Sequence, residues 1–198
     1  DRRHLPAPKV DVSGGSDGEV AQYLTQGINA DPHGVTRWHR DVADKGSSVT
    51  NVTNYVTSLF NQVATLYANE NVGVSISQIY VWSTPDPYIS QSNTGNLLNA
   101  FRTTRGTNFN GNLAHFLTTR SLGGGIAYVD VICLKQYAFG VSAINLTFQN
   151  VPTYSWSVEV VTHELGHNLG SWHTQSCSWP NGALDNCVSP EGSCSPGP

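Results

Sequence analysis

The sequence is short of charge, of lysine and of cysteine, and it has no methionine. Charged residues make up 12% of its 198 positions, against about 25% in ordinary globular proteins. Ten basic side chains and a net charge of −4 leave no basic surface for nucleic acid or an anionic membrane. No apolar run approaches the roughly 18 residues that a membrane span needs, since the best candidate, 126–134, is interrupted by Asp130. We therefore expect neither a nucleic-acid partner nor a membrane span.

The rest of the composition predicts a folded, exported domain. Apolar residues make up 38% of the chain and aromatic residues 10%, over a length that suggests one domain with a real core. A surface with little lysine and much Asn, Ser, Thr and Gly is common in exported proteins, so we expect a secreted, extracellular protein. Because it lacks an initiator methionine, the chain is either processed or an excerpt of a longer product.

The cysteines support the same compartment. Three of the four fall in a stretch rich in Pro, Gly, Ser and Asn, which has no apolar face and no regular backbone pairing of its own. Disulfides hold such segments together in exported proteins. The spacings of ten and seven residues do not fit the close cysteine pairs of structural zinc sites. The pairing stays open, as does the alternative of free thiols. The disulfide candidates are Cys133, Cys177, Cys187 and Cys194.

Hydrophobic periodicity predicts mixed helices and strands after residue 47. Apolar residues at three- and four-residue steps indicate helices, and near-alternating ones indicate strands. The expected helices are 49–67, 95–104 and one whose apolar stripe is Val158, Val161, Leu165 and Leu169 and which ends at Gly170. The expected strands are 72–82, 112–118 and 126–133. With no regular βαβ alternation, we expect an α+β fold. The chain divides into an N-terminal segment of uncertain structure, 1–47, and a domain at 48–198.

One motif carries chemistry. His163 and His167 are four residues apart, so on a helix both imidazoles face one metal ion. Glu164 lies one step round the helix, within reach of a water on that metal. Gly170 permits a turn with positive φ, which can return His173 to the same ion. Three neutral histidines leave a fourth tetrahedral position open, as a catalytic zinc site requires, although cobalt or iron would also fit.

Chance is a poor explanation of this motif. Five fixed residue types over eleven positions should arise about once in ten thousand chains of this length, at roughly 1 in 20 per position. The apolar stripe also falls on the opposite side of the same helix. By contrast, His115 stands alone in a predicted strand and is expected to be a buried structural residue. Asp86 and Asp130 are isolated carboxylates, and the sequence does not support a calcium site on them.

The segment from His163 to His173 resembles the active-site signature of the metzincin metalloproteases, most closely the adamalysin or reprolysin branch. Residues 125–133 are similar to that branch's substrate-aligning edge strand, which also ends in a cysteine. The resemblance implies a twisted mixed sheet with packed helices, an active-site helix and a small irregular, disulfide-stabilised C-terminal part. It also implies substrate contacts along the edge strand, by Gly125, Ile126, Ala127, Tyr128 and Val129.

The sequence departs from this branch near its end. Thr174 follows the third histidine where the branch usually has Asp, and the methionine turn beneath the metal is absent. The cysteine that matches Cys133 commonly pairs near the C-terminus, so its partner is expected to be missing. We therefore expect a chain cut at both ends, with an incomplete C-terminal subdomain.

Together these observations predict a monomeric zinc endopeptidase acting on peptides or proteins. One zinc ion on His163, His167 and His173 would activate a water, and Glu164 would take its proton. Two alternatives remain. A catalytically inactive binding module of the same fold would keep the zinc, but it would not need Glu164. A zinc amidase acting on other substrates would not need a long edge strand.

Overall fold

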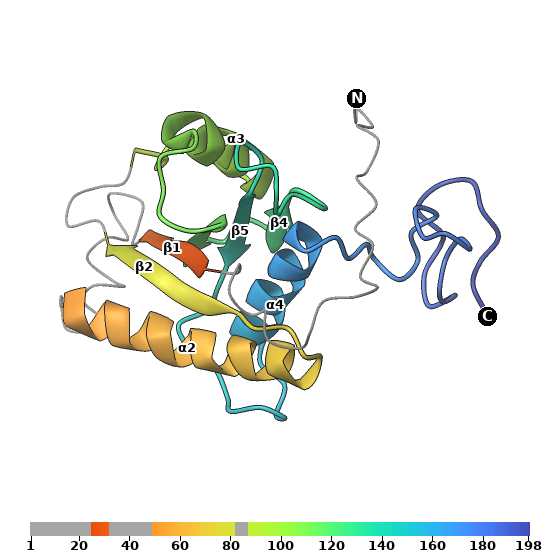
Figure 1. Cartoon of the computed structure of the whole chain (residues 1–198), viewed down its shortest axis with the longest axis horizontal. Coiled ribbons are helices and arrows are strands. Elements are labelled where there is room, and N and C mark those ends of the chain that lie inside the picture. Colours follow the sequence, from red (N-terminus) through yellow and green to blue (C-terminus); the bar gives the residue numbers. More distant parts are fainter. Residues whose placement is uncertain (1–24, 32–48, 82–86) are drawn as a thin grey trace.

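The computed structural model describes residues 25–31, 49–81 and 87–198, and of 25–31 only the backbone. The described residues form five strands and three helices in the order β1 (Thr25–Asp31), α2 (Val49–Asn69), β2 (Ser75–Val81), α3 (Thr94–Arg105), β3 (Leu113–Thr118), β4 (Gly125–Ala127), β5 (Phe139–Ala143) and α4 (Trp156–Asn168). The strands form one sheet in the order β2-β1-β3-β5-β4 (Figure 1). All neighbours are parallel except β4, which pairs antiparallel with β5 at one edge. The expected α+β fold with a mixed sheet is confirmed.

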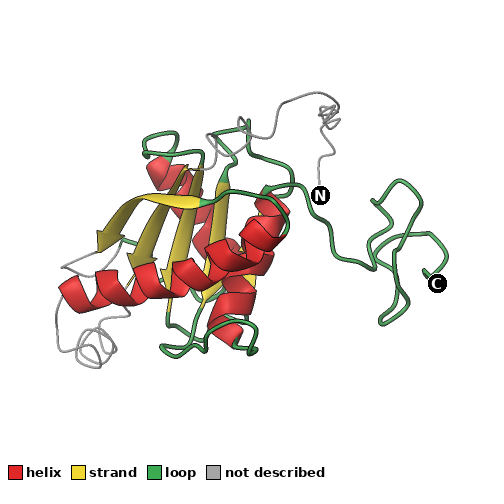
Figure 2. Ribbon diagram, turned by 60° about the horizontal axis from the view of Figure 1, so that its bottom comes forward, coloured by secondary structure: helices red, strands yellow, loops and turns green. Residues whose placement is uncertain are grey.

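Helices cover both faces of the sheet (Figure 2). All six residues of β3 are buried, as expected for a parallel strand packed on both sides. Leu113 and Leu117 point to the face that α2 and α4 cover, whereas Ala114 and Phe116 point to the α3 face. This alternation divides the core into two clusters, one on each side of the sheet.

The two predicted helices before β3 are confirmed. The 49–67 pattern becomes α2, which buries Val56, Leu59, Phe60 and Val63 at the three- and four-residue steps of one face. The 95–104 pattern becomes α3. This helix begins after Asn93, whose side chain accepts a hydrogen bond from the backbone N–H of Asn96 at 2.8 Å.

The predicted strands are partly correct. The 112–118 strand is confirmed as β3, and 72–82 shortens to β2, with Trp82 outside the described residues. The 126–133 strand is wrong beyond Ala127. There the backbone N–H groups of Asp130 and Val131 donate instead to the carbonyls of His167 and Asn168, at 2.9 and 3.0 Å. These residues therefore complete the C-terminal end of α4 rather than extend the sheet.

Two strands were not predicted. β1 comes from the segment before residue 48, whose structure the sequence left open, and it lies between β2 and β3. β5 lies between β3 and β4 and brings the edge strand next to α4. Asp86, on which the sequence did not support a calcium site, lies outside the described residues.

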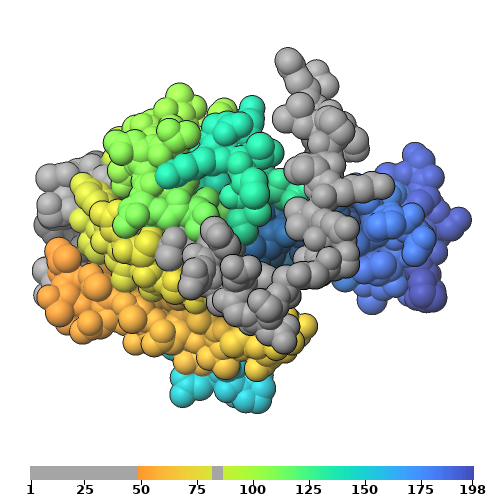
Figure 3. All heavy atoms as spheres, in the orientation of Figure 1, coloured from red at the N-terminus to blue at the C-terminus, as the bar shows by residue number. Residues whose placement is uncertain are grey.

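The last thirty residues follow α4 without a helix or strand of the sheet and lie at one end of the molecule (Figure 3). A disulfide between Cys177 and Cys194 and an isolated bridge between Ser176 and Glu191 hold them together. Among the residues described, no helix is both long and apolar enough to cross a membrane.

His115 is a buried structural residue, as expected. It is fully buried in β3, and its Nε2 lies 2.9 Å from the hydroxyl oxygen of Ser142 in β5. Burial lowers the pKa of His115 to about 3, because the charged imidazolium loses its hydration in the core. Gly140 leaves room for the ring, since a Cβ there would lie 2.8 Å from Nδ1.

This histidine should make the protein sensitive to acid. The unfolded chain binds a proton at residue 115 below pH 6.5, whereas the folded chain does so only near pH 3. The contribution of His115 to the free energy of unfolding is therefore fully present above pH 6.5 and is lost as the pH falls toward 3. The loss is about 2 kcal/mol at pH 5. In urea unfolding between pH 5 and 8, metal-free His115→Gln should lose stability toward low pH with a slope smaller than that of the wild type by about one proton near pH 5 and equal to it near pH 8. An equal slope in both proteins near pH 5 would contradict this assignment.

Candidate metal centre

Three histidines meet at the C-terminal end of α4. His163 and His167 lie one turn apart, so their imidazoles project from the same side of the helix. The helix ends at Asn168, and Gly170, with a φ of 105°, turns the chain in a conformation that favours glycine. The turn brings His173 against the other two rings. Its Nε2 lies 3.2 Å from that of His163 and 3.1 Å from that of His167.

These separations fit a tetrahedral zinc ion. Zn–N bonds of about 2.0–2.1 Å place tetrahedral ligand nitrogens about 3.3 Å apart. One ligand atom from each histidine lies within 4.8 Å of the others, the one such metal-binding group found in the described residues. One shared proton can bridge the lone pairs of only two of these nitrogens, whereas a cation at their centre can bind the lone pairs of all three. Burial, and then the charges of the other two rings, lowers the pKa of His163, which favours the neutral form that binds metal.

The outer nitrogens of two rings are also held. His167 Nδ1 donates a hydrogen bond to the carbonyl of Ser171 at 2.7 Å. A carbonyl only accepts, so the proton is on Nδ1 and the lone pair of Nε2 faces the site. His173 Nδ1 donates in the same way to Glu191 Oε1 at 2.8 Å. Second partners of this kind orient metal-binding histidines in proteins.

Glu164 is a buried carboxyl beside this cluster. It follows His163 on α4 and is 4% exposed, and its Oε2 makes no hydrogen bond. Burial, and secondly the nearby Glu159 carboxyl, raises the pKa of Glu164 to about 8. A divalent cation at the histidines would lower that pKa again and favour the carboxylate. A buried oxygen with no partner is suited to bind a water or substrate atom that the histidine site also holds.

The edge strand begins against this carboxyl. A Cβ at Gly125 would lie 2.4 Å from Glu164 Oε1, so the glycine leaves space for the glutamate side chain. β4 pairs with β5 on one side, and no described strand pairs with its other side. The free edge of the sheet therefore starts next to Glu164. This places the predicted substrate-binding residues Gly125, Ile126 and Ala127 beside the cluster, although their role stays a prediction.

The other two predicted substrate-binding residues lie past the end of the strand. Tyr128 contacts α3, where its hydroxyl accepts a hydrogen bond from Arg102 Nε at 3.0 Å and donates one to Asn99 Oδ1 at 3.2 Å. Val129 lies in the bend that leads to Asp130, whose φ is 56°. The N–H of Tyr128 still donates to the carbonyl of Phe139 in β5 at 3.2 Å, but the chain turns away after it, so a peptide paired with the strand would not meet Val129 in regular register.

The expected disulfide in the C-terminal part is confirmed. Cys177 and Cys194 form a disulfide within the C-terminal segment. Cys133 and Cys187 are exposed free thiols, so they are not disulfide partners in this structure. Cys133 lies in the loop between β4 and β5, away in sequence from the segment that the disulfide closes.

Two residues around the site were not predicted from the sequence. Asn168 is fully buried, and its amide donates to the carbonyls of Tyr128 and Phe139 at 2.9 and 3.0 Å, which ties α4 to the edge strand and β5. A signal existed, because position 168 continues the apolar stripe seven residues after Val161. Glu191 left no such signal, since its contact with His173 spans 18 residues of irregular chain.

The fold and the site together are those of the metzincin class of metallopeptidases. This class combines a mixed sheet with a helix that carries two histidines and a glutamate, and a third histidine follows a glycine turn. The reprolysin model of metallo-peptidase family M12 matches residues 26–197, so the chain belongs to this family. The expected resemblance to the reprolysin branch is therefore confirmed.

One curated relative is a metalloproteinase, and one solved structure shares the fold. The chain is 28% identical over 163 residues to the snake venom metalloproteinase trimerelysin-2 of Protobothrops flavoviridis, covering 77% of this chain and 73% of that protein. The solved structure of a chaperone–substrate complex shares 14% identity, with a TM-score of 0.54 over 80% of this chain. The match covers 25% of the chain in that structure and shows similarity of fold alone.

Proposed function

We propose that this chain is a zinc-dependent endopeptidase that hydrolyses internal peptide bonds of peptides or proteins. The observation that carries the proposal is the convergence of three histidine Nε2 atoms beside a buried carboxyl with an unbonded oxygen. His163, His167 and His173 would hold one zinc ion. Such an ion supplies Lewis acidity that activates water and polarises a carbonyl.

Glu164 would act as general base and then general acid. Its Oε2 would accept a proton from the attacking water while the water oxygen bonds to the scissile carbonyl carbon. The same carboxyl would then pass that proton to the departing amine as the C–N bond breaks. Burial at 4% exposure keeps the carboxyl away from competing bulk water. Three-histidine coordination alone does not require this glutamate, so its position favours an enzyme over an inactive zinc-binding module.

The substrate would bind in extended form along the free edge of β4. Backbone groups of Gly125–Ala127 would pair with the peptide main chain, so affinity would depend little on side-chain identity. The strand begins at Glu164, which would place a bound peptide bond near the base. This arrangement favours a peptidase over an amidase for other substrates. The disulfide and the venom relative support an extracellular location.

The proposal is tested by incubating the zinc-loaded chain with a mixed peptide pool, with and without a chelator, and identifying products by mass spectrometry. We expect cuts at internal bonds that stop with the chelator and return when zinc is added. A zinc-loaded chain that makes no cuts would support the binding module instead. Products trimmed only from their ends would contradict an endopeptidase.

A further inference from the structure

His173 is the one proposed ligand that no helix holds. It follows the turn at Gly170, and its side chain is 37% exposed. Glu191 reaches it from the far end of the C-terminal segment, with Oε1 2.8 Å from His173 Nδ1. The same oxygen accepts a hydrogen bond from Gln175 Nε2 at 3.1 Å. A carboxylate thus contacts the side of the imidazole that faces away from the cluster.

The position of Glu191 is fixed by its own backbone. Its N–H donates to the carbonyl of Gln175 at 3.0 Å, and its carbonyl accepts from the N–H of Cys177 at 3.1 Å. Three residues after Glu191, the disulfide between Cys194 and Cys177 links the same two chain segments covalently. Between them Gly192 has a φ of 126°, and a Cβ there would lie 2.9 Å from that of Cys177.

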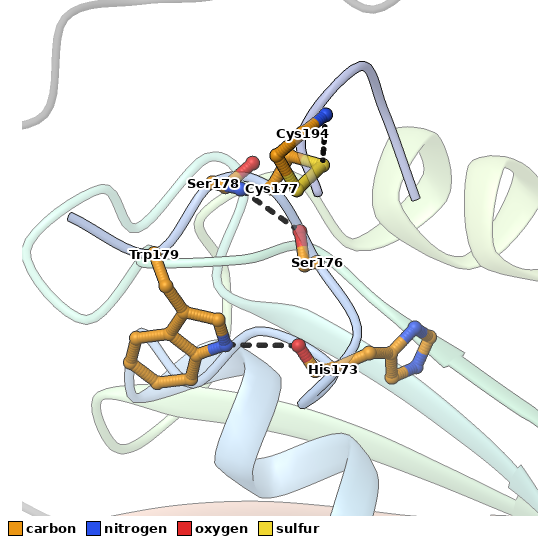
Figure 4. Close-up of a disulfide and its surroundings, with 6 residues drawn as sticks. All are labelled: His173, Ser176, Cys177, Ser178, Trp179 and Cys194. Carbon is orange, nitrogen blue, oxygen red and sulfur yellow. Dashed lines mark hydrogen bonds between the residues drawn. A yellow bond between two sulfur atoms is a disulfide. The ribbon is translucent and has the colours of Figure 1, made fainter. Parts of the chain in front are cut away.

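The chain around His173 is anchored to the same unit. The indole N–H of Trp179 donates to the carbonyl of His173 at 2.9 Å. Ser176 and the disulfide follow in the same part of the C-terminal segment (Figure 4). His173 is therefore held at its backbone by Trp179 and at its ring by Glu191. Both contacts depend on the segment that the disulfide closes.

We propose that Glu191 is a positioning residue for the metal centre, which the Cys177–Cys194 disulfide holds against His173. The carboxylate accepts a hydrogen bond from the Nδ1–H group, so the Nε2 lone pair of His173 stays directed at the zinc ion. The inference rests on the proposed function, because it requires zinc at the three histidines. Since both side chains are partly exposed, at 37% and 43%, orientation of the ring should matter more than the charge of the carboxylate.

Zinc affinity, measured by competition with a chromogenic chelator, tests this role without an activity assay. Glu191→Ala should weaken zinc binding about 10- to 100-fold. Glu191→Gln, which keeps an acceptor oxygen of the same shape, should lose less. Asp185→Asn is the matched control, since it removes a carboxylate from the same segment that does not contact a histidine, and it should bind like the wild type. Wild-type affinity in Glu191→Ala would overturn the proposal.

The same variants in a His173→Ala background separate positioning from a general effect. If Glu191 acts through His173, Glu191→Ala should cause no further loss of zinc affinity there. An equal loss in both backgrounds would overturn the proposal, since it would indicate a long-range charge or a structural role. Should the wild-type chain bind no zinc, the proposed function itself fails. If the wild type and Glu191→Ala bind zinc equally well, only this inference fails.

Discussion

Replacing Glu164 with glutamine is expected to lower the rate of peptide cleavage by about 10²- to 10⁴-fold, the range that a positioned general base contributes. The amide has nearly the same shape, so it should fill the buried space beside Gly125. It cannot accept a proton from water at neutral pH. Zinc affinity should remain, because the three histidines are unchanged.

The measurement is the initial rate on one peptide from the pool, with the zinc content of each sample determined in parallel. Glu70→Gln is a suitable control, since it makes the same chemical change at an exposed position after α2. A Glu164→Gln protein that cleaves at a rate close to that of Glu70→Gln would show that another group accepts the proton. Loss of zinc from Glu164→Gln would instead show that the glutamate helps to hold the metal.

Removing one histidine of the cluster should have a similarly large effect on metal binding. Structural zinc sites with four ligands bind with about 10–16 kcal/mol, or roughly 2.5–4 kcal/mol per ligand. His167→Ala should therefore weaken zinc binding about 10²- to 10³-fold. The loss should be largest at neutral pH, where the imidazoles of the wild type are unprotonated.

Chelator competition measures this loss, and His115→Gln provides the control. That substitution also removes a histidine, but from a fully buried position bonded to Ser142 outside the cluster. It should retain the zinc affinity of the wild type at pH 8. If His167→Ala also keeps that affinity, the cluster is not the zinc site.

The features that the sequence predicted depend on local spacing. The steps of three and four residues in α2 repeat within one helix, so neighbouring residues reveal its buried face. His163, Glu164 and His167 likewise lie within five residues of one helix, and Gly170 provides the turn that His173 needs. For such features, the spacing of residues along one helix or turn determines which side chains lie close together.

The features that the sequence did not predict depend on distant partners. β5 reads poorly as a strand because it contains Gly140 and Ser142, whose partners are distant in sequence. A Cβ at Gly140 would crowd the His115 ring, and the Ser142 hydroxyl contacts His115 and donates to the carbonyl of Val160. β1 has the sequence TQGINAD, which lacks the apolar run typical of a central parallel strand. Residues 128–133 have the composition of a strand, yet the N–H groups of Asp130 and Val131 donate to the carbonyls of His167 and Asn168 at the end of α4.

The contact between Glu191 and His173 shows the same limit within the site. Nothing near Glu191 in the sequence distinguishes it from an ordinary exposed carboxylate. Its place is set by a disulfide and by two backbone hydrogen bonds to residues 14 to 16 positions away. Such pairings follow from the whole segment and not from any short motif.

The central claim is that three histidines, and no cysteine, bind one zinc ion. X-ray absorption at the zinc edge of the chain loaded with one equivalent of metal tests it most directly. We predict a shell of nitrogen or oxygen atoms at about 2.0–2.1 Å, with the outer scattering of three imidazoles. A sulfur shell at about 2.3 Å would contradict the account, because it would place the metal on the free thiol of Cys133 or Cys187 instead.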